Sequence, residues 1–256
     1  MRGLTHLDLF SGIGGFALAA RWAGVDTVAF CEIDDFATKV LRKNFPGVPV
    51  LPDIKELNGN EFKGVNIITG GYPCQPFSVA GAQRAQNDDR HLWPEMRRVI
   101  AQAEPDWVIC ENVYGHVRLG LDAVLFDLAS LGYTAQPFVI PAVAAGANHR
   151  RDRVYIVAHA GGDGLYESTR TRCIGTPDDD RTQGADKSIY DEGRCGVRDT
   201  VGWGSCSSGA WGVEPPALRV DDGLPDRVDR IKSLGNAIVP QLAYKIFRGI
   251  AETVSR

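Results

Sequence analysis

The chain has 256 residues, enough for one large domain or one domain with an insertion, because a single core stops growing at roughly 250 to 300 residues. With 44% apolar and 23% charged residues, the composition excludes a disordered polyelectrolyte, and no apolar run reaches the ~18 residues of a membrane span. The net charge of −4 excludes a uniformly basic protein, and six scattered cysteines indicate neither a disulfide scaffold nor a zinc ribbon.

Short apolar runs alternate with segments of helical period through the first 160 residues. In chain order, the runs predict strands over Leu4–Phe10, Thr27–Glu32, Val65–Thr69, Trp107–Cys110, Phe138–Ile140 and Arg153–Ala158. The periodic segments predict helices over Gly14–Ala23, Asp34–Asn44, Leu92–Ala103 and Leu121–Leu131. This alternation is typical of crossover connections, so we expect an α/β fold whose mainly parallel sheet is covered by helices on both faces. The N-terminus shows no basic-then-apolar signal region, and we expect a soluble, cytoplasmic protein with reduced thiols.

The composition changes between residues 161 and 215. These 55 residues hold 11 glycines and only six Val, Ile, Leu or Met residues, too few for a core of their own. They carry ten acidic and six basic residues, which disfavours simple phosphate binding. Composition alone leaves open a plain surface elaboration or a substrate-reading insertion. Ser233–Ile250 then returns to helical periodicity, with Pro240 in or just before the first turn.

A glycine-rich turn follows the first predicted strand. Gly12, Gly14 and Ala17 satisfy G-x-G-x-x-[GA] between a strand and a helix, where backbone can approach a ligand closely. Glu32 ends the next strand, 20 residues after Gly12, and its carboxylate can accept hydrogen bonds from ribose hydroxyls. Asp53 follows in a similar position before the third strand. The pattern indicates a nucleoside-bearing cofactor without choosing among NAD, FAD and S-adenosylmethionine.

Cys74 follows a strand-like run at the edge where open α/β sheets place ligands. Pro73 and Pro76 restrict the loop around it and would hold the thiol in a fixed direction, which a nucleophile needs. Cys31 and Cys110 lie inside apolar strands, and we expect them to be buried and inert. The sequence therefore singles out Cys74 as a candidate nucleophile.

PCQPFS at residues 73–78 and FSGIGG at residues 10–15 resemble the cytosine-5 DNA methyltransferase family. Later segments follow the family's motif order across the chain, apart from the 55-residue stretch: DDRHLWPEMRRVI, WVICENV, HRRDRVYIVA and SLGNAIVPQLAYKIF. The arginine block departs from the family pattern at Asn148 and His149, where proline and glutamine are usual, whereas Arg151 and Arg153 match.

The resemblance implies a DNA (cytosine-5-)-methyltransferase in which Cys74 is the covalent nucleophile. C5 of cytosine is a poor nucleophile, and addition of a thiolate to C6 makes it electron-rich. Glu111 would contact N3 and the exocyclic amine, where a buried carboxyl with a raised pKa can act as the donor. Arg151 and Arg153 would lie near the cytosine O2, the thiolate and a phosphate. Their spacing of two at the start of an apolar strand predicts that they point to the same face.

The resemblance also implies a Rossmann-like class I methyltransferase fold that binds S-adenosylmethionine and acts on a base extruded from the duplex. It assigns the cofactor contacts to nine residues: Phe10, Gly12, Gly14, Glu32, Ile33, Asp53, Ile54, Leu92 and Asn236. Ile33 and Ile54 are suited to sandwiching adenine, although each could equally be core. No metal is expected, since the spacings of Cys173, Cys195 and Cys206 match no metal pattern.

In this family, the segment between the arginine block and the C-terminal helix reads the DNA. The resemblance divides the chain into a catalytic and cofactor-binding domain (1–160), a small loop-rich target-recognition insertion (161–230) and a C-terminal helix returning to the catalytic domain (231–256). The insertion holds arginines of the kind that contact guanine in the major groove: Arg170, Arg172, Arg181, Arg194 and Arg198. We expect a monomer of prokaryotic or phage origin whose partner is double-stranded DNA, and a cognate restriction endonuclease acting separately is compatible with this assignment.

Three rival interpretations stay open at this point. An NAD-dependent oxidoreductase would explain the glycine turn and Glu32, but it leaves Cys74, Glu111 and the arginine pair without a role. Methylation of transfer RNA occurs in one branch of the family, and the substantial insertion and the PCQPFS loop favour DNA instead. A catalytically silent DNA-binding protein would not need the nucleophile, the acid and the arginines that this chain retains.

Overall fold

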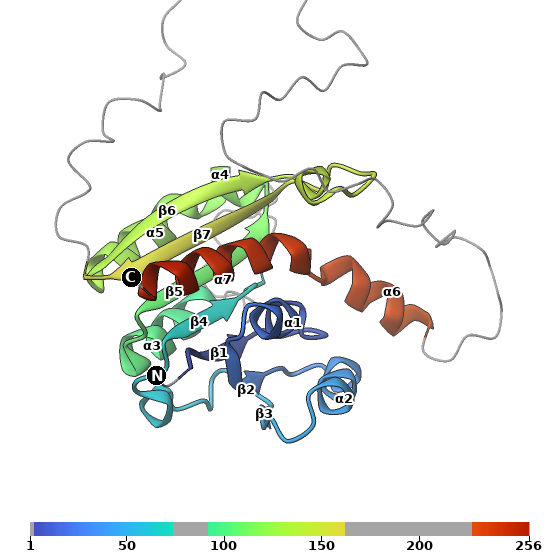
Figure 1. Ribbon diagram of the computed structural model, residues 1–256, viewed down its shortest axis with the longest axis horizontal. Helices are drawn as coiled ribbons and strands as arrows, with labels where there is room; N and C mark the ends of the chain where they lie inside the picture. Colours follow the sequence, from blue (N-terminus) through green and yellow to red (C-terminus); the bar gives the residue numbers. More distant parts are fainter. Residues whose placement is uncertain (1–2, 74–91, 162–226, 256) are drawn as a thin grey trace, which may run out of the picture.

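The computed structural model describes residues 3–73, 92–161 and 227–255 (Figure 1). Within these ranges seven strands form one sheet in the order β3-β2-β1-β4-β5-β7-β6. The strands are β1 (Thr5–Leu9), β2 (Asp26–Cys31), β3 (Val50–Leu51), β4 (Ile67–Gly70), β5 (Trp107–Val113), β6 (Tyr133–Ile140) and β7 (Arg153–Ala160). β1 to β5 pair in parallel, whereas β7 is antiparallel to both β5 and β6. The mainly parallel α/β sheet expected from the sequence is confirmed.

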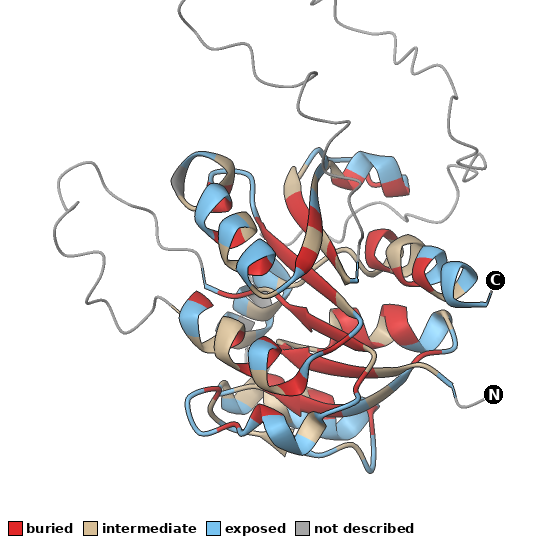
Figure 2. Ribbon diagram, turned by 90° about the vertical axis from the view of Figure 1, so that its left-hand side faces the viewer, coloured by how far each residue is buried: buried red, intermediate tan, exposed pale blue. Residues whose placement is uncertain are grey.

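Helices cover both faces of the sheet, as the alternating pattern predicted. On one face lie α1 (Gly15–Trp22) and α7 (Pro240–Val254), with α2 (Asp35–Asn44) beside α1. On the other face lie α3 (Trp93–Ala103) and α5 (Leu121–Ser130). Figure 2 shows buried residues along the strands and the inward sides of these helices. None of the helices in the described ranges has the length and apolarity needed to cross a bilayer.

The helix α3 illustrates how the spacing of apolar residues favours a helix packed on this face of the sheet. Its buried side chains recur at helical spacing, with Trp93, Met96, Ile100 and Ala103 on the side that faces the sheet. Each of them is at most 4% exposed. Pro94 in the first turn is compatible with the helix, because the amide hydrogen that it lacks has no partner there.

Several elements differ from the sequence predictions. β6 starts at Tyr133, five residues before the predicted Phe138, because an edge strand tolerates Pro137 in its middle. β3 and the four-residue helix α4 (His116–Leu119) were not predicted, since elements so short carry no periodic signal. The C-terminal segment forms two helices rather than one, α6 (Arg227–Asn236) and α7, and Pro240 stands in the first turn of α7 as predicted.

Gly14 is the N-cap of α1 and has a left-handed backbone with φ of 87°. A Cβ at this position would lie 2.8 Å from Phe45 Cε2 and 2.9 Å from Leu41 Cδ2. We expect Gly14→Ala to lower the free energy of unfolding by about 2 to 4 kcal/mol, from the left-handed backbone and from overpacking together. Urea unfolding measures this. Gly47→Ala is the control, because φ at Gly47 is also 87° but no atom lies within 4 Å of the added Cβ. This variant should lose only the part of the unfolding free energy that comes from the left-handed backbone. Equal losses of unfolding free energy in the two variants would contradict the packing argument.

Candidate active site

A cavity of about 710 Å³ opens where the parallel strands β1, β2, β4 and β5 reach their carboxyl ends. Open α/β sheets bind their ligands at this edge, and ligand cavities in proteins commonly measure ~300 to 1,000 Å³. Residues at or just after the ends of β1, β2, β3, β4 and β5 line it, and so do residues at the end of α6 and just after it: the lining includes 10–13, 31–34, 52–54, 71–73, 111–113 and 235–238. The cavity is therefore built by loops that are far apart in the sequence.

Most of the residues assigned to the cofactor meet in this cavity. Eight of the nine line it: Phe10, Gly12, Glu32, Ile33, Asp53, Ile54, Leu92 and Asn236. Gly14 is not among the lining residues, because the space beside its Cα is filled by Leu41 and Phe45. Its neighbour Gly15 lines the cavity instead.

Hydrogen bonds tie the glycine turn to the end of β2. The Gly12 amide donates to Glu32 Oε2 at 2.6 Å, and the Asp34 amide donates to Glu32 Oε1 at 2.8 Å. The Ser11 hydroxyl donates to the carbonyl oxygen of Asp8 at 2.6 Å. The Glu32 carboxylate is thus fixed at the cavity wall, and each oxygen keeps acceptor capacity for a hydroxyl.

The two isoleucines assigned to the adenine differ in their surroundings. Ile54 is only 4% exposed and belongs to the core, whereas Ile33 is 75% exposed and is not a core residue. An exposed isoleucine at the mouth of a cavity provides an apolar surface for a flat ring. Together with the carboxylate of Glu32 and the close backbone at Gly12, this lining fits the nucleoside part of S-adenosylmethionine.

Glu111 and Arg153 form the polar end of the cavity. Arg153 Nε lies 3.1 Å from Glu111 Oε1, and Glu111 is 8% exposed. In the antiparallel register Val113 is opposite Arg153, so Arg153 is a diagonal neighbour of Glu111 across β5 and β7. Burial raises the pKa of Glu111 to about 7, against the opposing effects of Arg153 and Arg151. A carboxyl with this pKa can be protonated near neutral pH.

Cys74 lies outside the described residues, but the three residues before it line the same cavity. A Cβ at Gly71 would lie 3.4 Å from Glu111 Oε2. Asn112 Nδ2 donates to the carbonyl oxygen of Tyr72 at 3.1 Å, and the Tyr72 hydroxyl is hydrogen-bonded to His116 Nε2 at 2.8 Å. The chain therefore leads toward Cys74 from a position beside Glu111.

Arg151 lies before β7, so strand alternation does not set its direction as the prediction assumed, but it is close enough to Arg153 and Glu111 to lower the pKa of Glu111. β7 begins at Arg153, and Arg151 precedes it with a left-handed backbone, φ 38°. Its guanidinium donates to the carbonyl oxygens of Gly235 and Ala237, both at 2.7 Å. Arg151 does not line the cavity; it holds the end of α6 and the residue just after it, and both of these line the cavity.

Several lining residues had no signal in the sequence. Lys232 Nζ lies 2.7 Å from Asp34 Oδ2, which joins α6 to the N-cap of α2 at the cavity rim. Cys31 also lines the cavity, and burial raises the pKa of its thiol to about 12. Cys31 and Cys110 are both buried, as predicted.

Among the described residues, no three His, Cys, Asp or Glu side chains gather as a metal site would require.

In this parallel sheet the first strand leads into a glycine turn, and the second strand is followed by a carboxylate at a cavity. This arrangement defines a Rossmann-like enzyme domain for a nucleoside cofactor. The chain belongs to the C-5 cytosine-specific DNA methylase family, whose model matches residues 4–184. This membership confirms the family and the fold class expected from the sequence.

The chain is also similar to individual methyltransferases, in sequence and in structure. The Type II methyltransferase M.HgiBI of Herpetosiphon aurantiacus is 36% identical over 163 residues, 61% of this chain and 37% of that protein. The Type II methyltransferase M.NgoMIV of Neisseria gonorrhoeae is 35% identical over 159 residues, 60% of this chain and 51% of that protein. The crystal structure of a mutant of Spodoptera frugiperda DNMT2 superimposes with a TM-score of 0.56 at 27% identity, covering 69% of this chain and 56% of the other. The chain thus spans about half or less of the length of these two curated relatives.

Proposed function

We propose that this protein transfers a methyl group from S-adenosylmethionine to C5 of a flipped-out cytosine in double-stranded DNA. The observation that carries the proposal is the position of Glu111. Its buried carboxyl, paired with Arg153, lines the same cavity as the glycine turn and the residues that lead to Cys74. An acid, a cation and a nucleoside-binding turn around one cavity suit chemistry on a bound base beside a bound cofactor.

The residues that would hold the cofactor lie at the end of the cavity formed by β1, β2 and β3. Glu32 would accept hydrogen bonds from the ribose hydroxyls, while Ile33 and Ile54 would cover the faces of the adenine. Bound S-adenosylmethionine supplies an electrophilic methyl group to C5. Asp53 and Leu92 also line the cavity.

The protein's own residues would activate the cytosine. The Cys74 thiolate adds to C6, the pair of the C5–C6 double bond shifts to C4–C5, and the pair of the C4–N3 double bond moves to N3 and is shared with O2, which leaves an enamine that is nucleophilic at C5. Protonated Glu111 donates to N3, and Arg153 stabilises the negative charge that develops. After C5 has taken the methyl group, N3 returns its proton to Glu111. Water takes the C5 proton, the pair of the C5–H bond re-forms the C5–C6 double bond, and the C6–S bond breaks to release the Cys74 thiolate. No metal takes part in these steps.

We assign residues 1–160 to catalysis and cofactor binding, 161–230 to target recognition, and 231–256 to the segment that returns to the catalytic domain. Support for the last assignment comes from residues 235–238 at the cavity and from α7 on the sheet. The α6 helix starts at Arg227, so its first turns fall within the range assigned to target recognition. The proposed partner is duplex DNA, bound by a monomer, and a restriction endonuclease of the same specificity would act as a separate protein.

Bisulfite sequencing of DNA from cells that express the protein tests this function. We expect protected cytosines within one short sequence and none in cells without the protein. Incubation of the purified protein with tritiated S-adenosylmethionine should label duplex DNA and not transfer RNA. Label in transfer RNA alone, or tight binding of NAD in place of S-adenosylmethionine, would refute the proposal in favour of a rival.

A further inference from the structure

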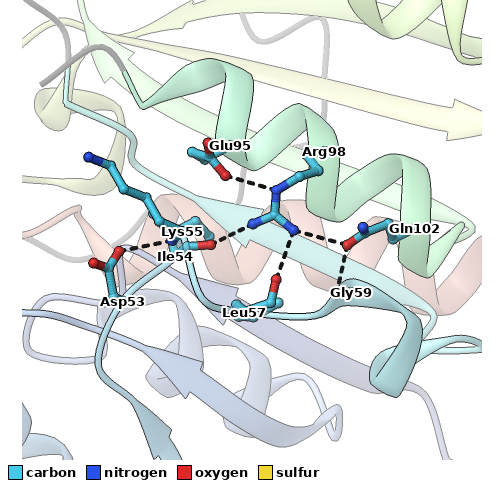
Figure 3. Close-up of polar contacts among 8 residues, drawn as sticks. All are labelled: Asp53, Ile54, Lys55, Leu57, Gly59, Glu95, Arg98 and Gln102. Carbon is cyan, nitrogen blue, oxygen red and sulfur yellow. Dashed lines mark hydrogen bonds and ion pairs between the residues drawn. The ribbon is translucent and has the colours of Figure 1, made fainter. Parts of the chain in front are cut away.

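Arg98 of α3 connects this helix to the irregular segment between β3 and the 3₁₀ helix η1 (Gly59–Phe62), as Figure 3 shows. Its Nη2 donates to the carbonyl oxygen of Ile54 at 2.7 Å, and its Nη1 donates to the carbonyl oxygen of Leu57 at 2.8 Å. Glu95 Oε2 accepts from Nε at 2.8 Å, and Gln102 Oε1 accepts from Nη1 at 3.1 Å. All three guanidinium nitrogens are therefore engaged.

A second contact from α3 holds the far end of the same segment. The Gly59 amide donates to Gln102 Oε1 at 2.9 Å, so Gln102 accepts from Arg98 and from Gly59 (Figure 3). Glu95, Arg98 and Gln102 are spaced three and four residues apart and share one side of the helix. The backbone between Ile54 and Gly59 is thus attached to α3 at three points.

This attachment bears directly on the cavity. Asp53 and Ile54 form one part of the lining, and Leu92, the N-cap of α3, forms another. Arg98 itself does not line the cavity. Because α3 provides Leu92 and also holds the carbonyl of Ile54, the distance between these two parts of the lining depends on the Arg98 contacts.

We propose that Arg98 is a positioning residue for the cofactor: it fixes the backbone of Asp53 and Ile54 so that this wall of the cavity is formed before S-adenosylmethionine binds. The inference rests on the proposed function. A guanidinium suits the task because its planar fork presents fixed donors to several oxygens at once, whereas an ammonium cannot match that geometry. The side chain is 33% exposed, so its removal opens no large cavity in the core.

The test compares Arg98→Met and Arg98→Lys with Arg97→Met. Arg97 is the preceding residue on the same helix, but it pairs with Asp127 of α5 at 3.4 Å and does not line the cavity. Calorimetry with S-adenosylhomocysteine gives the Kd, thermal unfolding without ligand gives the stability, and amide hydrogen exchange reports on residues 53–59. We expect Arg98→Met to raise the Kd about tenfold and to speed exchange in that segment, since hydrogen bonds to charged groups are lost.

Arg98→Lys should fall between the wild type and Arg98→Met, and Arg97→Met should match the wild type in Kd and in exchange. A lowered melting temperature with an unchanged Kd and unchanged exchange would overturn the inference, because Arg98 would then only stabilise the fold. Failure of the wild type to bind S-adenosylhomocysteine would instead refute the proposed function. In that case exchange in residues 53–59 would still decide whether Arg98 fixes the segment.

Discussion

Cys74→Ala is expected to abolish methyl transfer, with a rate at least ~10⁴-fold below that of the wild type, as for the loss of an essential nucleophile. The reason is electronic: without a thiolate at C6, C5 of cytosine is not electron-rich enough to accept a methyl group. Binding of S-adenosylmethionine should persist, because the residues proposed to hold the cofactor, Glu32 and Ile33 among them, are unchanged in this variant. Transfer of tritiated methyl groups to duplex DNA measures the effect.

A duplex containing 5-fluorocytosine provides the direct readout of the same step. Fluorine at C5 cannot leave as a proton does, so the wild type should remain covalently attached and migrate as a heavier band in a denaturing gel. Cys110→Ala is the matched control, since Cys110 is buried in β5 and does not line the cavity. It should form the adduct as the wild type does. An adduct with Cys74→Ala, or its absence with the wild type and cofactor, would contradict the thiolate mechanism.

The sequence predicted the central sheet because buried parallel strands are continuous apolar runs, and these are visible without any knowledge of pairing. β3 was missed because two residues carry no pattern, and β6 was predicted too short because Pro137 and Gln136 interrupt its apolar run. The break between α6 and α7 follows from Pro240, which disfavours helical backbone at Val239 (ψ 103°).

The site was predictable where it depends on strand ends, since consecutive parallel strands place their carboxyl ends along one edge. Glu32 was found for this reason, Asp53 was noted only for its place before the third predicted strand, and Glu111 was assigned by the family resemblance; all three line the cavity. The contact between Glu111 and Arg153 depends on the register of β5 and β7, which strand patterns alone do not give. The sequence does not show that Arg97 and Arg98 have different roles. Their positions around the axis of α3 decide this: Arg98 contacts the carbonyl oxygen of Ile54, whereas Arg97 pairs with Asp127 of α5.

Glu111→Gln is expected to lower kcat by about 10² to 10⁴, the usual contribution of a positioned acid. Only protonated Glu111 donates to N3, and its pKa is raised to about 7 by burial. In the wild type, kcat/KM should therefore fall as the pH rises through about 7 on account of this group. Glutamine is neutral at every pH, so kcat/KM of the variant should not fall above about pH 7 on account of this residue. Only the rise of kcat/KM with pH that comes from formation of the Cys74 thiolate should remain. Profiles of kcat/KM between about pH 5.5 and 9 compare the two, and the same alkaline limb in both proteins would contradict the role of Glu111.

The same pKa has a consequence for stability that does not depend on activity. Glu111 ionises at about 4.5 in the unfolded chain and at about 7 in the folded protein, so the unfolded state loses its proton first. As the pH rises from about 4.5 to above 7, this group therefore costs the wild type up to about 3 kcal/mol of unfolding free energy, and the cost disappears as the pH falls again. Glu111→Gln lacks this cost, and Arg153 faces a neutral side chain in both proteins at low pH. Urea unfolding should show the variant gaining stability relative to the wild type across this interval. A difference that stays constant with pH would mean that the carboxyl titrates normally and is ionised when cytosine binds.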